Sequence, residues 1–315
     1  MEELLLACNV QGTVNADTPR ISVQYGTKKK DNVLTVPLTV LHSDCCTEQW
    51  TGVYWKALPH PNWSLHKSAS LSFGWIEVEY TRNLSEVTRL CYQQMFEICK
   101  DVGTPHVLRT WNYFPHINAG KPSSQYQLFC EGRATAYAKL NTKEQDYPAA
   151  TVIGTQQSSF ILMFIAGEQP GHGIENPRQT SAFHYPKVYS EHSPLFSRAL
   201  VYQNEKQLQL YISGTASITG HATQHYDDVE QQTKEVLNNL NSLIAEAQEK
   251  YPFEDFSLRD FAQLKVFVKQ EEDLSTIQAL LSKELNEDTP ICYLHGEMCR
   301  PDLLVEIEGT FLQAR

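Results

Sequence analysis

The spacing of hydrophobic residues changes along the chain between a period of two, typical of strands, and a period of 3.6, typical of helices. Residues 34–40 and 71–80 alternate as strands do. A helical pattern then runs from Asn83, a residue type that caps helix starts, to Gly103, a residue type that ends them. The first half continues with a strand at 106–111, a loop at 112–122, a helix at 124–140 and an apolar strand region at 150–166.

The second half repeats this order. Its predicted elements are strands at 178–184, 197–202 and 208–218, a helix that begins at 226–228, a strand at 263–269, a helix at 273–285 and strands at 291–294 and 303–310. A repeated order of elements indicates two similar domains. We therefore expect an α+β fold with two domains, residues 1–170 and 171–315, joined in the loop at 167–177. A site between the two halves is the usual consequence.

The last predicted strand carries two acids on one face. Leu303, Val305 and Ile307 face one way, whereas Leu304, Glu306 and Glu308 face the other. Two interpretations are open. The acids are solvated on an exposed face, or Glu306 lies in a pocket where burial raises its pKa so that it donates a proton. Alternation alone does not separate these interpretations.

Charge and hydrophobicity exclude several classes of partner. The 315 residues carry a formal net charge of −11, and apart from the lysines at 28–30 there is no basic run, which argues against nucleic acid and anionic membranes. The longest hydrophobic run, 159–167, is far shorter than the ~20 residues of a membrane span. The acidic N-terminus does not resemble a signal peptide. We expect a soluble, cytoplasmic protein without a membrane partner.

Cysteines and histidines give little evidence of reactive sites. None of the eight cysteines forms a C-x-x-C pair, so we expect reduced thiols that mostly pack in the core. His221 and His225 are four residues apart, but no acid lies between them as in H-E-x-x-H, and they precede a helix. We predict no metal site.

Small and cationic residues near strand ends are more informative. The stretch 213–217, Ser-Gly-Thr-Ala-Ser, interrupts a strand, and glycine in a strand usually marks the close approach of a ligand or of another backbone segment. Arg133 and Arg198 lie among apolar residues. Each is a surface cation, a structural ion-pair partner, or one of two guanidinium groups that together bind a dicarboxylate.

Several motifs resemble known families. Residues 210–221 (LYISGTASITGH), 228–240 (DVEQQTKEVLNNL) and 304–309 (LVEIEG) resemble the RidA/YjgF family. Residues 111–118 (WNYFPHIN), 126–133 (YQLFCEGR) and 176–186 (NPRQTSAFHYP) resemble the chorismatases, two-domain relatives of RidA that remove pyruvate from chorismate. The resemblance covers roughly residues 95–315. It implies two RidA/YjgF-like domains, which are also chorismate-mutase-like, with mixed sheets and helices packed on one face.

The resemblance also implies site residues. The catalytic acid of the family falls on Glu306, and Gly214 with Cys299 resembles the class that forms 3-hydroxybenzoate. The corresponding substrate-binding residues are Tyr126, Arg133, Tyr185, Arg198, Gly214 and Thr215. Glu306 would protonate the enol ether of chorismate, and the neighbouring ring hydroxyl would then displace the side chain. No metal or cofactor is implied.

Alternative functions remain open at this point. Other chorismatases hydrolyse chorismate to 3,4-dihydroxycyclohexa-1,5-dienecarboxylate or form mixed 3- and 4-hydroxybenzoate. Imine hydrolysis, as in RidA, is disfavoured because residues 289–294 lack the carboxylate-binding arginine of those relatives. A further alternative is a protein that binds small acids but is not an enzyme.

Rid proteins form trimers, but a duplicated chain would bury part of that interface internally, so we expect a monomer.

Overall fold

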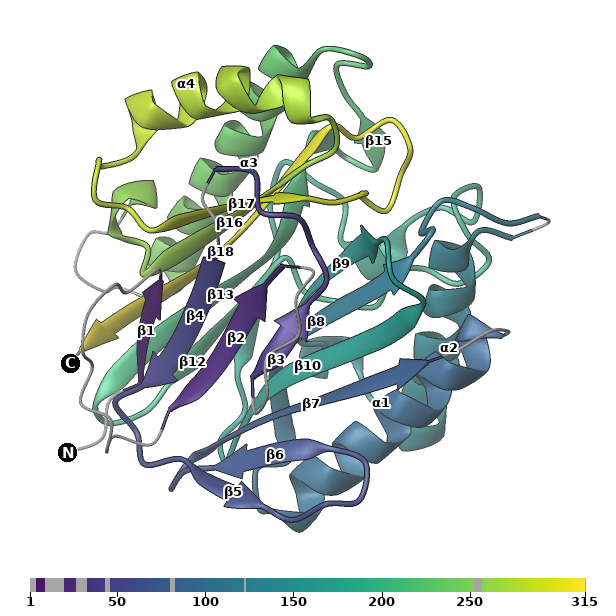
Figure 1. Cartoon of the computed structure of the whole chain (residues 1–315), viewed down its shortest axis with the longest axis vertical. Coiled ribbons are helices and arrows are strands. Elements are labelled where there is room, and N and C mark those ends of the chain that lie inside the picture. The colour runs from purple at the N-terminus through teal and green to yellow at the C-terminus, as the bar shows by residue number, and fades with distance from the viewer. Residues whose placement is uncertain are drawn as a thin grey trace.

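Three main sheets form the body of the molecule (Figure 1). The computed structural model describes residues 4–8, 20–26, 33–42, 46–79, 83–121, 123–251 and 257–314. The small sheet has the strand order β1 (Leu5–Cys8), β4 (Cys46–Thr51), β2 (Ile21–Tyr25) and β3 (Leu34–Val36). The lysines at 28–30 and Cys45 lie outside the described residues.

The two large sheets have six strands each and the same strand order. The first consists of β5 (Lys56–Leu58), β6 (Ser64–Lys67), β7 (Leu71–Glu79), β10 (Ser159–Gly167), β8 (His106–Pro115) and β9 (Ala149–Thr155). The second consists of β11 (His172–Ile174), β12 (Ala199–Gln203), β13 (Gln207–Ala216), β18 (Val305–Ala314), β16 (Gln263–Val268) and β17 (Ile291–His295). In each sheet only the last pair is parallel. Strands β10 and β18 therefore occupy equivalent places.

Each large sheet carries two helices on its outer face (Figure 1). The first sheet has α1 (Leu84–Asp101) and α2 (Gln125–Leu140), and the second has α3 (Val229–Lys250) and α4 (Leu274–Glu284). The remaining elements are the hairpin β14 (Ile218–Thr219) and β15 (Ala222–Thr223) and short 3-10 helices at Glu144–Asp146, Ala182–His184, Leu258–Asp260 and Glu271–Asp273. This arrangement confirms the predicted α+β class. The domain boundary at 170 stays a prediction.

Local capping residues set the helix starts. The Asn83 side chain accepts a hydrogen bond from the Glu86 amide, as predicted, and Gly103 follows α1 with a φ of +78°. Asp228 caps α3 in the same way by accepting a hydrogen bond from the Gln231 amide.

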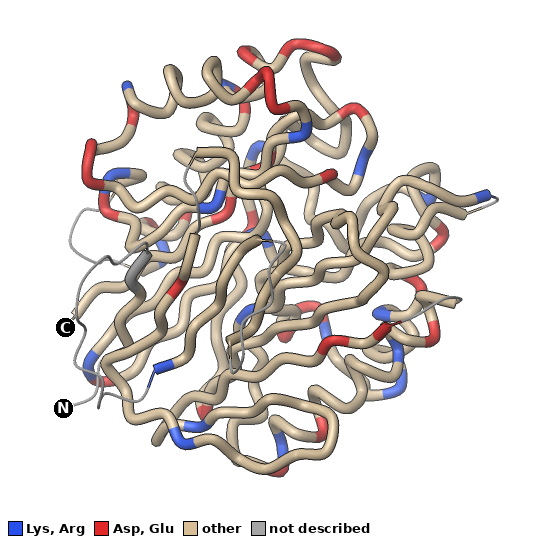
Figure 2. The backbone as a smooth tube through the Cα atoms, in the orientation of Figure 1, with Lys and Arg blue, Asp and Glu red and all other residues tan. Residues whose placement is uncertain are grey.

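None of the helices in the described residues is long and apolar enough to cross a membrane. Acidic and basic residues are interspersed over the outside of the molecule (Figure 2).

The small sheet packs against the inner faces of both large sheets. Trp50 of the small sheet lies with its ring centroid 6.0 Å from that of Trp111 and 5.8 Å from that of Phe73, both in the first large sheet. Tyr211 and Leu294 of the second large sheet belong to the same buried cluster. The core of the molecule is therefore shared by three sheets.

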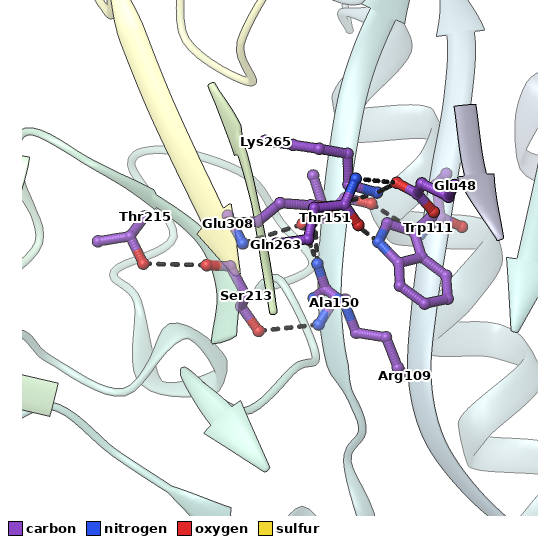
Figure 3. Close-up of polar contacts among 12 residues, drawn as sticks. Glu48, Arg109, Trp111, Ala150, Thr151, Ser213, Thr215, Gln263, Lys265 and Glu308 are labelled. Carbon is purple, nitrogen blue, oxygen red and sulfur yellow. Dashed lines mark hydrogen bonds and ion pairs between the residues drawn. The ribbon is translucent and has the colours of Figure 1, made fainter. Parts of the chain in front are cut away.

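Four buried charges join these sheets (Figure 3). Lys265 Nζ lies 2.9 Å from Glu48 Oε1 and 2.6 Å from Glu308 Oε1. Arg109 Nη2 lies 2.7 Å from Glu308 Oε2. We call Glu48, Arg109, Lys265 and Glu308 the buried charge cluster; its two positive and two negative groups balance. Such pairing is required because a lone buried ion is strongly unfavourable.

Some predicted boundaries are wrong. Residues 178–184 form a turn, a single β-bridge at Gln179 and a short 3-10 helix rather than a strand. Local backbone hydrogen bonds, from the His184 amide to the Ser181 carbonyl for example, take the place of a strand ladder. Strand β8 extends into the predicted loop as far as Pro115. Asn112 is compatible with a strand there because its buried side chain donates a hydrogen bond to the Thr151 carbonyl. The apolar region at 150–166 is two strands, β9 and β10.

The expectation that the cysteines are all reduced is also wrong. Cys46 of β4 forms a disulfide with Cys292 of β17, with a Cα–Cα distance of 6.1 Å. The two residues are 246 positions apart, so no local spacing could indicate the pair. Cys91, Cys99 and Cys130 are free and buried, as expected of core thiols.

Candidate active site

A cavity of about 430 Å³ lies beside the C-terminal part of β13. Its wall includes the start of α2, the loop that precedes β12, strands β13 and β18, and the loop that precedes β18. Six of the residues predicted from the sequence line it: Tyr126, Tyr185, Arg198, Gly214, Cys299 and Glu306. The structure thus brings together residues that are up to 180 positions apart in the chain.

Glu306 supplies the acid of this cavity. It pairs with Ala216 of β13 and Phe267 of β16 in the middle of the second large sheet, and it is 5% exposed. Burial, and secondarily the charge of Glu308, raise the pKa of Glu306 to about 8. The Glu306 carboxyl is therefore largely protonated at neutral pH. The interpretation of a solvated acid pair is wrong, since Glu308 is buried as well.

Glu308 has the opposite character. Burial opposes ionisation of its carboxyl, but Lys265 and Arg109 outweigh burial and hold the pKa of Glu308 below its usual value. Trp111 Nε1 donates a further hydrogen bond to Glu308 Oε1 at 2.8 Å. Glu308 therefore stays charged inside the buried charge cluster, whereas Glu306 holds its proton.

Gly214 makes room for the Glu306 carboxyl. Strand β13 has a bulge here, where Ser213 and Gly214 lie opposite the single residue Glu308 of β18. A Cβ atom at position 214 would lie 1.9 Å from Glu306 Oε1, so the carboxyl could not keep its present position beside any larger residue. The close approach predicted from the glycine is thus an approach of the acid to the backbone.

Arg198 brings a buried positive charge to the cavity. Its Nη2 donates to the Tyr185 hydroxyl at 2.7 Å and to the Thr180 carbonyl at 2.9 Å. Its Nε is buried and has no hydrogen-bond partner within the described parts of the chain. A buried donor without a partner is costly, so Arg198 is suited to bind an anion that enters the cavity.

Arg300 is a second cavity cation, and the sequence reasoning missed it. Its guanidinium lies 4.1 Å from the ring centroid of Tyr189 and 5.4 Å from that of Tyr185. Its Nη1 donates to the Thr223 hydroxyl at 3.2 Å. In the sequence, only its position next to Cys299 indicated that Arg300 could lie near the site. Arg198 and Arg300 together give the cavity two guanidinium groups.

Cys299 lines the cavity as a neutral thiol. Burial, and then the nearby Glu306, raise the pKa of Cys299 to about 12. A thiol with this pKa is not ionised at neutral pH and is therefore a poor nucleophile. The contribution of Cys299 to a reaction stays a prediction.

Two predicted binding residues do not line the cavity. Arg133 of α2 is fully buried, with its guanidinium 4.7 Å from the ring centroid of Phe129. Burial opposes its charge, but the surrounding tyrosines, Tyr92 first, hold the pKa of Arg133 above its usual value. Thr215 is buried and its hydroxyl donates to the Ser213 carbonyl at 2.9 Å. Substrate binding by Arg133 and Thr215 stays a prediction.

The histidines face different partners. His221 Nδ1 lies 3.1 Å from the Tyr189 hydroxyl, whereas His225 Nε2 lies 3.9 Å from Glu235 Oε2. Among the residues that the structure describes, no group of three His, Cys, Asp or Glu side chains could hold a metal ion. The ionisable side chains that line the cavity include the carboxyl of Glu306 and the guanidinium groups of Arg198 and Arg300.

Comparison with known proteins gives consistent matches. The family described as "Chorismatase FkbO/Hyg5-like, N-terminal" matches residues 48–166. A chorismatase of Streptomyces hygroscopicus is 30% identical over 310 residues, which cover 91% of this chain and 87% of that protein. A 3-hydroxybenzoate synthase of the same organism is 34% identical over 241 residues, 74% of this chain and 71% of that protein. A crystal structure of a chorismatase superposes with a TM-score of 0.89 and 28% identity, covering 98% of both chains.

Proposed function

Since this chain belongs to the chorismatase family, we propose that it cleaves chorismate to 3-hydroxybenzoate and pyruvate. The observation that carries this proposal is the pKa of Glu306, which is raised to about 8 in a cavity that also contains Arg198 and Arg300. The curated relative named 3-hydroxybenzoate synthase supports this product.

The first step is proton transfer from the Glu306 carboxyl to the terminal methylene of the enolpyruvyl group. This protonation converts the enol ether into an oxocarbenium ion and leaves Glu306 as a carboxylate. An ordinary surface glutamate is ionised at neutral pH and has no proton to give. The burial of Glu306 is therefore the property that the reaction requires.

The second step releases pyruvate. The oxygen of the neighbouring ring hydroxyl bonds to the ring carbon that bears the side chain, while the carbon–oxygen bond to the side chain breaks and its electrons form the pyruvate carbonyl. The hydroxyl proton returns to the Glu306 carboxylate, which regenerates the acid. The resulting arene oxide opens and aromatises to 3-hydroxybenzoate. The two products together contain all atoms of chorismate, so no water is consumed.

Arg198 and Arg300 are suited to the two carboxylates of chorismate. The chain has a net charge of −11, which repels a dianion, so local cations have to provide the attraction. Guanidinium groups bind carboxylates through charge-assisted hydrogen bonds, which are stronger inside a cavity than in water. Gly214 and Cys299 shape the wall next to Glu306, and the resemblance links this pair of residues to the 3-hydroxybenzoate outcome.

The test is incubation of the purified chain with chorismate. We expect equal amounts of pyruvate and 3-hydroxybenzoate, separated by chromatography from 4-hydroxybenzoate and the dihydrodiol. In D₂O the pyruvate methyl group should contain one deuterium, because its third hydrogen comes from the acid. Saturable binding of chorismate without any product would overturn the proposal and favour a non-catalytic binding protein.

We also propose that the chain acts as a monomer. The cavity is lined by residues of both halves of one chain, including Tyr126 from α2 and Glu306 from β18. Light scattering after size-exclusion chromatography tests this proposal; a stable trimer would contradict it.

A further inference from the structure

The bulge of β13 is attached to the neighbouring large sheet rather than to β18. The Ser213 hydroxyl accepts a hydrogen bond from the Ala150 amide of β9 at 2.8 Å and donates to the Ser197 carbonyl at 2.6 Å. The Gly214 amide donates to Thr151 Oγ1, also on β9, at 3.0 Å. Figure 3 shows Ser213 and Thr151 at this junction. The Ser213 amide also donates to the Arg198 carbonyl at 3.0 Å. The backbone beside the acid is therefore held by β9 of the other half together with the segment that precedes β12.

Thr151 connects this bulge to the buried charge cluster. Its side chain is 1% exposed, and its Oγ1 accepts a second hydrogen bond from Arg109 Nη2 at 2.5 Å. The same Arg109 nitrogen contacts Glu308 Oε2 at 2.7 Å (Figure 3). One buried hydroxyl thus receives N–H groups from the cluster and from the Gly214 backbone.

The position of Gly214 in turn limits the position of Glu306. Since even a Cβ on Gly214 would lie 1.9 Å from Glu306 Oε1, the Gly214 backbone forms one wall of the space that the carboxyl occupies. We propose that Thr151 is a positioning residue for the Glu306 carboxyl, although Thr151 itself does not line the cavity. This inference rests on the proposed function only where turnover is the readout.

A change at position 151 tests the hydroxyl without changing side-chain volume. Thr151→Val leaves the buried Gly214 N–H without its acceptor and removes one of the two acceptors of Arg109 Nη2, the other being Glu308 Oε2. Thr151→Ser keeps the acceptor. Thr88→Val is the matched control, because Thr88 is a buried threonine of α1 whose hydroxyl has no hydrogen-bond partner within the described residues.

The turnover experiment compares kcat and KM for pyruvate release. A misplacement of about 1 Å at a reacting group costs up to ~100-fold in rate, so we expect Thr151→Val to lower kcat by about 10-fold or more. KM should change by less than about 3-fold, because Arg198 and Arg300 are untouched. Thr151→Ser should restore kcat, and Thr88→Val should not change it. An unchanged kcat in Thr151→Val would overturn the inference. A fall in kcat that is in the same proportion to the fall in melting temperature in Thr151→Val and Thr88→Val would overturn it as well.

A second readout does not depend on turnover. With glutamate labelled at the side-chain carboxyl carbon, the ¹³C resonance that disappears in Glu306→Gln belongs to Glu306, and its titration can be followed. The groups that act on this carboxyl are Glu308 on its own strand, Arg109 on β8, Arg198 before β12 and the Cys299 thiol in the loop before β18. Glu308 is itself stabilised in its charged form by Thr151. A loosened bulge would admit water, so the titration midpoint should fall in Thr151→Val but not in Thr88→Val. If the wild type fails to cleave chorismate but the midpoint still falls, the proposed function is wrong and the positioning role stands. An unmoved midpoint refutes the positioning role.

Discussion

Glu306 and Glu308 lie two residues apart on the same face of β18, yet Glu306 holds a proton and Glu308 holds a charge. The difference arises from their partners, since Glu308 contacts Lys265 and Arg109, whereas Glu306 faces the cavity. One strand therefore carries both a protonated carboxyl in the cavity and a charged carboxylate that joins the sheets of the core.

Replacement of the acid should abolish the reaction. A glutamine at position 306 has the size of the acid but no carboxyl proton, so we expect Glu306→Gln to reduce pyruvate release by about 10³-fold or more. Binding of a substrate analogue, measured by calorimetry, should be largely preserved. Glu97→Gln, at an exposed position of α1, is the control. Normal turnover in Glu306→Gln would remove Glu306 from its role.

The rate should fall at alkaline pH. Because the pKa of Glu306 is raised to about 8, the acid is protonated below that pH and loses its proton above it. We expect kcat/KM to be level on the acid side of this value and to fall by about tenfold per pH unit above it. In the pH profile of kcat, the alkaline fall should begin at the same pH or at a higher pH, since a bound dianion further disfavours ionisation of Glu306. A rate that rises through pH 8 would require a base instead.

Arg300 should contribute to substrate affinity. A lysine at position 300 keeps the charge but loses the planar pair of donors, so Arg300→Lys should raise KM by about 10-fold or more with a smaller effect on kcat. Steady-state kinetics with chorismate measures both constants. Arg89→Lys on α1 serves as the control, because Arg89 pairs with Glu86 in solvent. Equal KM values for both variants would mean that Arg300 does not bind a carboxylate.

An alanine at position 214 should disturb the acid directly. Its methyl group would overlap Glu306 Oε1, so the carboxyl has to move within the cavity. We expect Gly214→Ala to lower 3-hydroxybenzoate formation by about 10- to 100-fold and to increase the fraction of the dihydrodiol. Chromatography of the products measures the ratio. An unchanged rate and ratio would show that the carboxyl does not need this space.

Loss of Lys265 should destabilise the whole fold. Lys265→Met leaves the buried carboxylates of Glu48 and Glu308 without their shared cation, and breaking a buried pair in this way costs about 3–5 kcal/mol. Urea unfolding measures the loss. Lys234→Met, at a partly exposed helix pair, should change stability by less than about 1 kcal/mol. Similar unfolding midpoints for the two variants would contradict the importance of the buried charge cluster.

Features encoded by neighbouring residues could be predicted from the sequence. The cap at Asn83 and the common face of Glu306 and Glu308 depend only on short spacings, and the structure has both. Of the six predicted residues that line the cavity, Glu306, Arg198 and Gly214 were candidates from their own sequence pattern. The resemblance added Tyr126, Tyr185 and Cys299. The fold class followed from the repeated order of elements, because that order is visible without any tertiary contact.

Features that depend on distant partners could not be predicted. The burial of Glu308 requires Arg109 from the other large sheet, and the Cys46–Cys292 disulfide joins residues 246 positions apart. Arg300 enters the cavity only because its loop folds against Tyr189. Asn112 suggested a loop, although its amide satisfies a buried carbonyl on β9. In each case the deciding partner is absent from the local pattern.

The equivalent positions of β10 and β18 raise the question of how many ligand molecules one chain binds. Strand β10 reads SFILMFIAG, all of it buried and none of it ionisable, so it fills the core where β18 presents an acid. Of these two equivalent strands, only β18 therefore offers a carboxyl for the proposed proton transfer. Calorimetric titration with an unreactive chorismate analogue should accordingly saturate at one molecule per polypeptide, despite the twofold repetition of its architecture.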